Sequence, residues 1–442
     1  MNSELDRREI ALEILDSVFE KKRFLHIELR REFNAHPTLT LTRKAFIKRI
    51  CQGTTERLIE IDAVINSFSK VKVKKQKPFI RTLLRMSVYQ IMYMDSVPDS
   101  AAVNEAVKLA KRHHFGQLSG FVNGVLRSIA RGYKDLDFPE NIKYSMPEWL
   151  YELFKSQYPD NYMDICEAFL SHADKGTIIR INKSKLADEE PLVLEINAEP
   201  VCKELSLYRL ADIEGVESVK GFSKGLFSIQ DPAAALAVHL GSPKENSICL
   251  DMCAAPGGKT IQLADEIRGT GHIFSRDISE AKLPLIDAEV KRCGFKNITV
   301  EAGDASHFNE SEEGKYDFVL ADVPCSGLGV IGTKPDIKIN ETPEGLESLV
   351  DLQKSILECA VRYVKIGGTL VYSTCTLNRA ENEDMVAWLL ENISGFELVD
   401  IEAMIPKGFL AFYKSKGEIC VLPRAGLCEG FFVAVLRRKK EA

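Results

Sequence analysis

Long apolar runs are missing from this 442-residue sequence, which has no stretch of about 18 consecutive apolar residues, so we expect no transmembrane helix. The N-terminal segment MNSELDRREIALEIL is charged and lacks the uninterrupted apolar core of a signal peptide. Hydrophobic residues make up 45% and charged residues 28%, as in ordinary soluble globular proteins. We therefore expect a cytoplasmic protein with no membrane partner. The length predicts two or three domains.

Paired cysteines are missing as well. The eleven cysteines are scattered along the chain, their number is odd, and no C-x-x-C pair occurs. A disulfide scaffold or a zinc ribbon needs tighter, paired spacing, so we expect neither of them and no bound metal. Most of these cysteines are predicted to be small, buried apolar residues.

An overall excess of basic residues is also absent, because the net charge is −6. The charge is unevenly distributed, however. Residues 1–140 contain 25 Lys and Arg against 17 Asp and Glu, a balance of +8, whereas the rest contains 33 against 47, a balance of −14. This asymmetry favours a basic N-terminal module that binds a polyanion; the alternative is a chance difference between the two parts.

Periodicity divides the chain into three parts. Residues 1–135 are predicted to form an all-helical domain, because apolar residues recur at helical spacing. Residues 136–225 begin as a linker and contain a predicted strand at 177–182, which indicates a small α+β connecting domain. In residues 226–442 short apolar strands alternate with helices, which predicts an α/β, Rossmann-like domain with a mostly parallel sheet covered on both faces. Ligands of such sheets bind beyond the carboxyl ends of the strands.

The first predicted strand of the third part, residues 247–252, runs into the sequence DMCAAPGGKT and then into a helix. This loop is neither G-x-G-x-x-G nor the phosphate loop G-x-x-x-x-G-K-[ST]. Its small residues and paired glycines allow the backbone to approach a ligand closely, and the helix N-terminus favours an anionic group. A nucleoside with a carboxylate tail therefore fits better than a pyrophosphate. The alternative interpretation is a tight strand-to-helix turn without a ligand.

Acidic residues follow the next two predicted strands. Asp277 ends the second strand, 26 residues after Asp251, an interval at which an acid commonly accepts hydrogen bonds from ribose hydroxyls. Asp304 follows the third strand, where an aspartate can meet an adenine amino group. Either acid alone would more often be a solvated loop residue. Their positions at successive strand ends favour a nucleoside site.

Two cysteines lie at the ends of the fourth and fifth predicted strands, Cys325 in DVPCSG and Cys375 in STCT. A cysteine taken at random is more often a core residue, but neighbouring strand ends face one pocket. One reaction that needs a cysteine thiolate beside a nucleoside site is the methylation of cytosine. Its C5 atom is too weak a nucleophile to take a methyl group unaided, and a thiolate that adds to C6 removes this obstacle. Asp322 is placed to assist near N3 and N4 of the base, and Lys259 is a candidate for stabilising the thiolate. The target base has to leave its stack to reach the pocket. The residues alone do not decide which cysteine attacks.

Several motifs together resemble the RNA cytosine-5 methyltransferase family: DMCAAPGGKT, DVPCSGLGV, KPDIK, YSTCTLNRAENE and EGFF. The segments RTLLRMSVYQIMY, VNEAVKLAK and FVNGVLRSIA resemble NusB-type antitermination domains. The pairing looks like the bacterial Sun/Fmu type, which acts on small-subunit (16S) ribosomal RNA. The resemblance covers nearly the whole chain. It implies S-adenosylmethionine as the cofactor and ribosomal RNA as the partner, and we expect a monomer.

The same resemblance assigns roles to individual residues. It implies that Cys375 is the nucleophile and that Cys325 assists release of the product RNA. The residues that it places around the cofactor are Cys253, Ala254, Ala255, Pro256, Gly257, Gly258, Lys259, Asp277, Asp304 and Asp322.

The chain departs from the family pattern at three places. Gly332-Thr333 stands where two arginines are common, Ile339 where a tryptophan is common, and Glu429 where an aspartate is usual. We expect these positions on the RNA-binding face. Two alternatives stay open at this point: transfer RNA as the substrate, and a non-catalytic NusB-like protein that only docks on RNA.

Overall fold

The computed structural model describes residues 7–171, 176–210 and 215–439 of the chain. Residues 1–6, which belong to the segment considered above for a signal peptide, lie outside this description. The described chain forms two compact units: the first runs up to Leu170 and adds a later segment, Ile331–Asn340, and the second contains the remainder. The predicted boundaries at residues 135 and 225 do not coincide with this division. Among the described helices, none combines the length and apolar character that crossing a bilayer requires.

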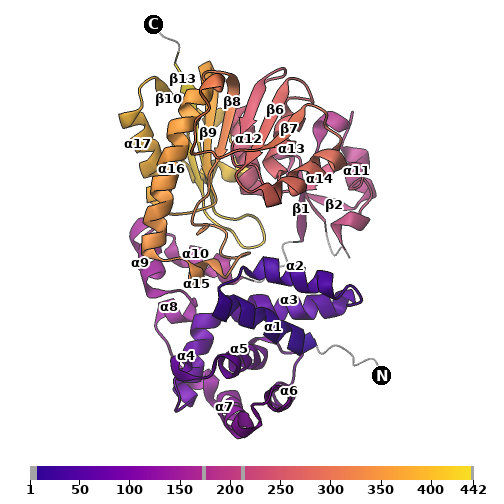
Figure 1. Cartoon of the computed structure of the whole chain (residues 1–442), viewed down its shortest axis with the longest axis vertical. Coiled ribbons are helices and arrows are strands. Elements are labelled where there is room, and N and C mark those ends of the chain that lie inside the picture. The colour runs from indigo at the N-terminus through magenta and orange to yellow at the C-terminus, as the bar shows by residue number, and fades with distance from the viewer. Residues whose placement is uncertain (1–6, 172–175, 211–214, 440–442) are drawn as a thin grey trace. The chain divides into compact units, whose positions relative to one another are not determined.

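The first unit is built from helices, as its apolar periodicity predicts (Figure 1). Ile10, Ile14 and Val18 lie on one face of α1, and all three are buried in a core shared by the neighbouring helices. The α-helices of this unit are α1 (Arg7–Lys21), α2 (Leu25–Ala35), α3 (Leu41–Glu56), α4 (Leu58–Phe68), α5 (Pro78–Tyr93), α6 (Asp99–Arg112), α7 (Ser119–Gly132), α8 (Glu140–Lys143), α9 (Glu148–Gln157), α10 (Tyr162–Leu170) and α15 (Ile337–Asn340).

The segment Ile331–Asn340, which contains the KPDIK motif, belongs to the helical unit although it is distant in sequence. Lys338 is 1% exposed, and its Nζ donates a hydrogen bond to the backbone oxygen of Glu56 at 2.5 Å. Asp336 is also 1% exposed and accepts a hydrogen bond from the backbone nitrogen of Leu25 at 3.3 Å. Ile339 packs against the helical core. Ile339 is thus a partly buried packing residue of the helical unit, and its expected place on the RNA-binding face stays a prediction.

Burial of Lys338 predicts a pH-dependent stability. Loss of solvation lowers the pKa of Lys338 from 10.5 to about 7, so the unfolded chain binds the extra proton between these values. The unfolding free energy should therefore rise as the pH increases from about 7 to 10.5. Lys338→Met removes this titration. We expect the wild-type chain to gain up to about 4 kcal/mol relative to Lys338→Met over that interval.

Trp149 on α9 reports on the helical unit, provided that the second tryptophan of the chain is removed by Trp388→Phe. Urea unfolding of the wild-type and Lys338→Met chains in this background, at pH 7 and pH 10, measures the difference. Other titrating groups cancel between the two proteins. Equal pH dependence of the two proteins would contradict the prediction.

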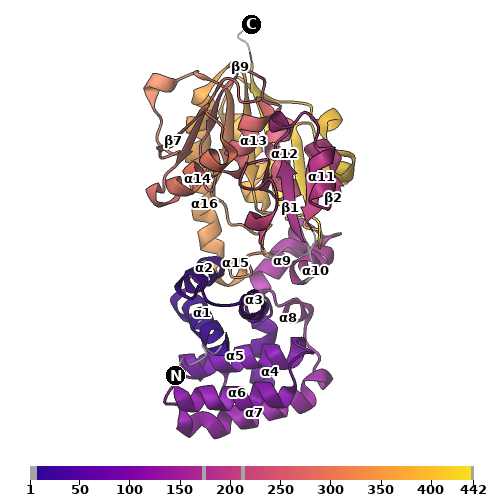
Figure 2. The ribbon, with the colours of Figure 1, turned by 90° about the vertical axis from the view of Figure 1, so that its right-hand side faces the viewer.

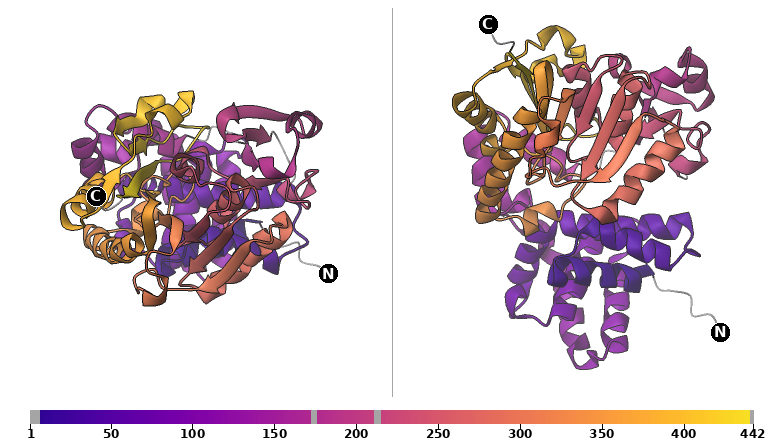
Figure 3. Two further views of the ribbon diagram at one scale, coloured as in Figure 1. Left: turned by 90° about the horizontal axis from the view of Figure 1, so that it is seen from above. Right: turned by 45° about the horizontal axis from the view of Figure 1, so that its top comes forward.

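The second unit contains a large sheet (Figure 3). Its strand order is β11-β12-β13-β9-β8-β5-β6-β7, and β10 also pairs with β13. The strands from β9 to β7 are parallel, as predicted, and β13, β12 and β11 extend the sheet in antiparallel fashion. The strand bounds are β5 (Ile248–Asp251), β6 (His272–Asp277), β7 (Ile298–Ala302), β8 (Tyr316–Asp322), β9 (Val364–Thr374), β10 (Phe396–Leu398), β11 (Tyr413–Ser415), β12 (Glu418–Val421) and β13 (Phe431–Arg438).

Helices cover both faces of the large sheet. The connection from β5 through α13 to β6 runs in one direction across the sheet, and that from β8 through α16 to β9 runs in the other. Because such crossovers are right-handed, α13 and α16 lie on opposite faces (Figure 2). The helices of this unit are α11 (Glu190–Glu195), α12 (Pro232–Gly241), α13 (Gly258–Glu266), α14 (Leu283–Cys293), α16 (Pro343–Tyr363) and α17 (Glu383–Asn392).

A small antiparallel sheet, in the order β2-β3-β1-β4, precedes the large one. Its strands are β1 (Thr177–Ile181), β2 (Ala198–Cys202), β3 (Leu207–Leu210) and β4 (Phe227–Ile229), and β1 matches the strand predicted at 177–182. Arg180 of β1 is 3% exposed and donates to Asp265 of α13 at 2.7 Å and to Gln230 at 2.7 Å. This buried ion pair fixes the small sheet against the helix that follows the glycine-rich loop.

Candidate active site

A pocket of about 180 Å³ opens at the carboxyl ends of β5 and β8, where ligands of open α/β sheets bind. Its lining combines the glycine-rich loop, the end of β8 and the start of α12. The lining residues are Ile229, Gln230, Asp231, Ala234, Asp251, Cys253, Ala254, Ala255, Pro256, Gly258, Lys259 and Asp322. Most of the predicted cofactor residues thus surround one cavity.

The loop between β5 and α13 is held close to the sheet by its backbone. Ala254 donates to the backbone oxygen of Arg276 at 2.8 Å, and Ala255 donates to a carboxylate oxygen of Asp277 at 3.1 Å. Gly257 precedes α13 with a φ of 109°, a left-handed conformation that favours glycine. The loop therefore presents backbone atoms to the pocket, and the amino end of α13 begins directly behind it.

Asp251, the last residue of β5, has an acceptor that nothing in the described structure uses. Its side chain is 1% exposed; Oδ2 accepts a hydrogen bond from the hydroxyl of Thr260 at 2.7 Å, whereas Oδ1 has no partner. Burial raises the pKa of Asp251 to about 7. A buried polar atom without a partner is costly, so a ligand that donates a hydrogen bond to Oδ1 would relieve that cost.

Asp277 and Asp304 end or follow strands as predicted, but neither is among the residues that line the pocket. Asp277 is 7% exposed and is engaged by the backbone nitrogens of Ala255 and Ser279. Hydrogen bonds from Ser306 lower the pKa of Asp304, which also contacts His307 at 2.8 Å. Asp277 thus supports the loop, and Asp304 lies in a local turn.

Lys259 and Asp322 form an ion pair within the pocket. The Lys259 Nζ lies 2.8 Å from Asp322 Oδ2, and Asp322 Oδ1 accepts a hydrogen bond from Ser373 at 2.7 Å. Burial alone would lower the pKa of Lys259, but the charge of Asp322 outweighs it and the pKa is raised. Cys375 also interacts electrostatically with Lys259. The pair therefore places a stable positive charge near one of the two cysteines.

Cys325 and Cys375 are brought together as the strand-end argument predicts. Their Sγ atoms are 3.3 Å apart, and the backbone nitrogen of Cys375 donates to the Cys325 sulfur at 3.3 Å. Both residues are partly exposed, unlike eight of the other nine cysteines, which are buried. The hydrogen bond with Cys375 and burial raise the pKa of Cys325 well above its usual range. Two partly exposed cysteines thus lie side by side at the carboxyl edge of the sheet.

The loops that contain Gly329, Cys375 and Gly430 lie in close contact, and this contact depends on the two glycines. Gly329 donates to the backbone oxygen of Cys375 at 2.9 Å, and Gly430 donates to the backbone oxygen of Gly329 at 2.8 Å. A Cβ atom at Gly329 would lie 2.3 Å from the Gly430 oxygen and 2.8 Å from the Cys375 oxygen. A side chain at this position would force the loop that carries Cys325 away from Cys375.

Gln230 and Asp231, which no motif in the sequence singles out, line the pocket just before the start of α12. Asp231 caps that helix by accepting from Ala233 at 2.9 Å, and Pro232 follows at the first helical position. This pattern predicts a helix start but no ligand contact. Burial and then the charge of Glu429 raise the pKa of Asp231 to about 6. Glu429 thus lies beside a pocket residue, and its expected place on the RNA-binding face stays a prediction.

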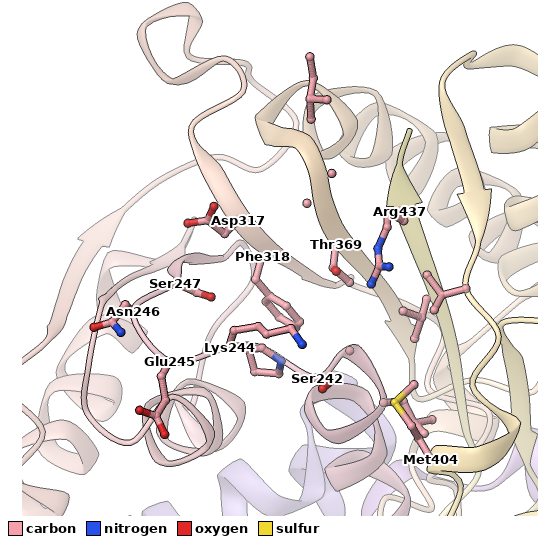
Figure 4. A pocket seen from close by; sticks show the side chains of 18 residues that line it. Ser242, Lys244, Glu245, Asn246, Ser247, Asp317, Phe318, Thr369, Met404 and Arg437 are labelled. Carbon is pink, nitrogen blue, oxygen red and sulfur yellow. The ribbon is translucent and has the colours of Figure 1, made fainter. Parts of the chain in front are cut away.

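A larger cavity of about 700 Å³ lies at the other end of the same strands (Figure 4). Ser247 before β5, Asp317 at the start of β8 and Thr369 in β9 border it. This is the edge opposite to the two cysteines. Its two acids are already paired: Asp317 accepts from Ile248 at 3.0 Å and from Lys365 at 2.9 Å, and Glu245 pairs with Arg268 at 3.2 Å. Size therefore does not identify the active site here. Within the described residues no group of three or more His, Cys, Asp or Glu is suited to hold a metal ion.

Comparison with known proteins gives matches to both units. Residues 238–437 match the family model "16S rRNA methyltransferase RsmB/F", and residues 5–131 match the NusB family. The chain is 34% identical to "Probable ribosomal RNA small subunit methyltransferase B" of Bacillus subtilis (strain 168), with 98% of each protein covered. The crystal structure of the protein PH0851 is 26% identical, with a TM-score of 0.81 over 99% of both chains. The crystal structure of NSun6 from Pyrococcus horikoshii with SFG shares the fold: it is 22% identical, with a TM-score of 0.57, over 67% of this chain and 99% of that one.

Proposed function

The chain belongs to the family of ribosomal RNA small subunit methyltransferases B, and from this premise we propose that it methylates C5 of one cytosine in 16S ribosomal RNA through a covalent cysteine adduct. Membership makes the chain an S-adenosylmethionine-dependent ribosomal RNA methyltransferase. The choice of cytosine C5 and the role of the cysteines are the proposed part. The observation that carries them is the 3.3 Å separation of the Cys325 and Cys375 sulfurs.

The residues around the pocket fit S-adenosylmethionine. The unpartnered Oδ1 of Asp251 can accept a hydrogen bond, and the loop from Cys253 to Lys259 offers backbone atoms without bulky side chains. In this proposal the loop residues, Asp277, Asp304 and Asp322 hold the cofactor. The NSun6 structure includes SFG, an analogue of this cofactor, in a protein of the same fold. Bound S-adenosylmethionine supplies an electrophilic methyl group.

In the proposed reaction the two cysteines act in sequence. The thiolate of Cys375 adds to C6 of the cytosine, which makes C5 nucleophilic. When C5 carries the methyl group, a base removes the C5 proton and the thiolate leaves, which restores the aromatic ring. Cys325 assists this release from its position beside the Cys375 sulfur. The positive charge of Lys259 stabilises the attacking thiolate, and Asp322 contacts the N3 and N4 side of the base.

The proposed partner is the RNA of the small ribosomal subunit, which places the protein in the cytoplasm. Residues 1–140 contain 25 basic and 17 acidic residues, a net charge of +8. This positive charge supports RNA binding by the helical unit, because it attracts the phosphate groups of RNA. The family matches favour ribosomal RNA over the alternative of transfer RNA.

Bisulfite sequencing of 16S ribosomal RNA tests the proposal directly. In cells that carry the gene, one cytosine should resist conversion, and in a deletion strain the same cytosine should be converted. A plasmid copy of the gene should restore resistance. The purified chain should then transfer labelled methyl groups from S-adenosylmethionine to RNA from the deletion strain and to none from the parent. A change confined to transfer RNA, or no change at any cytosine, would contradict the proposal.

A further inference from the structure

Glu381 is a buried carboxylate close to both cysteines that the reaction described above does not use. It ends the short helix η9 (Arg379–Glu381), six residues after Cys375, and it is 0% exposed. A carboxylate in such a place is costly unless several donors surround it. The donors that surround Glu381 come from the loops that carry the two cysteines and from α16.

One carboxylate joins the residues that directly follow the two cysteines. Its Oε1 accepts from the Ser326 backbone nitrogen at 2.9 Å, and its Oε2 accepts from the Ser326 hydroxyl at 2.5 Å. The Thr376 hydroxyl also donates to Oε2, at 3.2 Å, and the Ser326 and Thr376 hydroxyls are 2.7 Å apart. Ser326 follows Cys325 and Thr376 follows Cys375. The two cysteine loops therefore meet at Glu381 as well as at the sulfur atoms.

Further hydrogen bonds hold the side chain and the backbone of Glu381 in place. Gln353 of α16 donates from Nε2 to Glu381 Oε1 at 3.0 Å and to the backbone oxygen of Pro324 at 2.9 Å. The hydroxyl of Tyr372, on β9, donates to the backbone oxygen of Glu381 at 2.6 Å, and Asn378 donates to Oε2 at 3.2 Å. Gln353 of α16 thus holds the carboxylate of Glu381, and Tyr372 of β9 holds its backbone, so two regular elements fix the residue that joins the two loops.

We propose that Glu381 is a positioning residue that holds the Cys325 and Cys375 loops in the arrangement from which the two sulfurs act on one base. This inference rests on the proposed cysteine chemistry. Glu381 acts on the two loops through its hydrogen bonds to Ser326 and Thr376. Misplacing a reacting group by about 1 Å can cost on the order of 100-fold in rate, so loss of this contact should be visible in the chemical step.

Glu381→Gln tests the inference because it preserves size and replaces one acceptor oxygen by a donor amide. Each of the two carboxylate oxygens accepts at least two hydrogen bonds. The Ser326 backbone nitrogen at Oε1 and the Asn378 amide nitrogen at Oε2 can only donate, so in either orientation the new amide nitrogen faces a group that cannot accept from it. We expect the single-turnover rate of methyl transfer to fall about 100-fold, with the KM for RNA and the affinity for S-adenosylmethionine within threefold of wild type. In a Cys325→Ala background, where the adduct is trapped, adduct formation should slow by a similar factor.

Glu383→Gln is the matched control, because it makes the same substitution two residues away in α17 and should leave the rate within threefold of wild type. Thermal unfolding and cofactor binding verify that both variants are folded. If Glu381→Gln does not fold, Ser326→Ala and Thr376→Val each remove one donor and should slow the reaction about three- to tenfold. The inference is wrong if folded Glu381→Gln keeps a wild-type rate, or if both donor variants do. Absence of 5-methylcytosine from the wild-type reaction would instead refute the proposed function.

Discussion

Cys375→Ala is expected to transfer no measurable methyl groups to 16S ribosomal RNA, whereas Cys325→Ala should bind the RNA covalently and fail to release it. Without the Cys375 thiolate, no group adds to C6 and C5 stays unreactive, so the rate should fall by at least about 10⁴-fold. Without Cys325 the adduct forms but is resolved slowly. Incubation with unmethylated RNA and labelled S-adenosylmethionine, followed by denaturing electrophoresis, should show the adduct only for Cys325→Ala.

The same experiment distinguishes the roles of the two cysteines, whose positions in the structure are too similar to assign them. Their sulfurs are 3.3 Å apart, and both side chains are partly exposed. The double variant should form no adduct, because attack precedes release. Cys253→Ala is a control for the loss of a third partly exposed thiol, and it should form no trapped adduct. Robust methylation by Cys375→Ala, or an adduct that persists in it, would reverse the assignment.

The carboxyl edge of the sheet could be predicted from the sequence because the relevant residues follow strands directly. Asp251 and Asp322 end β5 and β8, and Cys375 comes after the last residue of β9. Short apolar strands followed by small or polar residues have a regular pattern, and neighbouring parallel strands bring their ends together. The proximity of Cys325 and Cys375 follows from this topology without knowledge of any side-chain contact.

Features that depend on distant pairing could not be predicted. The strands β11, β12 and β13 extend the sheet in antiparallel fashion through segments that only the folded chain brings together. Lys338 lies in the polar motif KPDIK, where a lysine is expected at the surface, but it is buried within the helical unit. Glu381 lies in the motif YSTCTLNRAENE, but the motif does not reveal its partners, because Ser326, to which it is hydrogen-bonded, is 55 positions away in the sequence. Such contacts leave no periodic pattern in the sequence.

Lys259 and Asp322 form an ion pair within the pocket, 2.8 Å apart. Lys259 carries a stable positive charge because Asp322 overcomes the effect of burial on its pKa, and this charge also interacts with Cys375. If Asp322 is neutralised, burial dominates and the pKa of Lys259 falls. If Lys259 is removed, the thiolate loses its cation and Asp322 loses its partner. Each single change therefore disrupts the same arrangement.

Lys259→Met and Asp322→Asn should each lower the single-turnover rate about 10²- to 10⁴-fold, and the double variant should be no slower than the slower single variant. Lys365→Met is the control, because Lys365 pairs with Asp317 at 2.9 Å near the opposite end of β8 and is half exposed, where such pairs contribute little. Calorimetric titration with S-adenosylmethionine separates loss of cofactor binding from loss of chemistry. If the two single effects multiply in the double variant, Lys259 and Asp322 act independently and the proposed coupling is wrong. If Lys259→Met keeps a wild-type rate, the cation that stabilises the Cys375 thiolate has to be sought elsewhere.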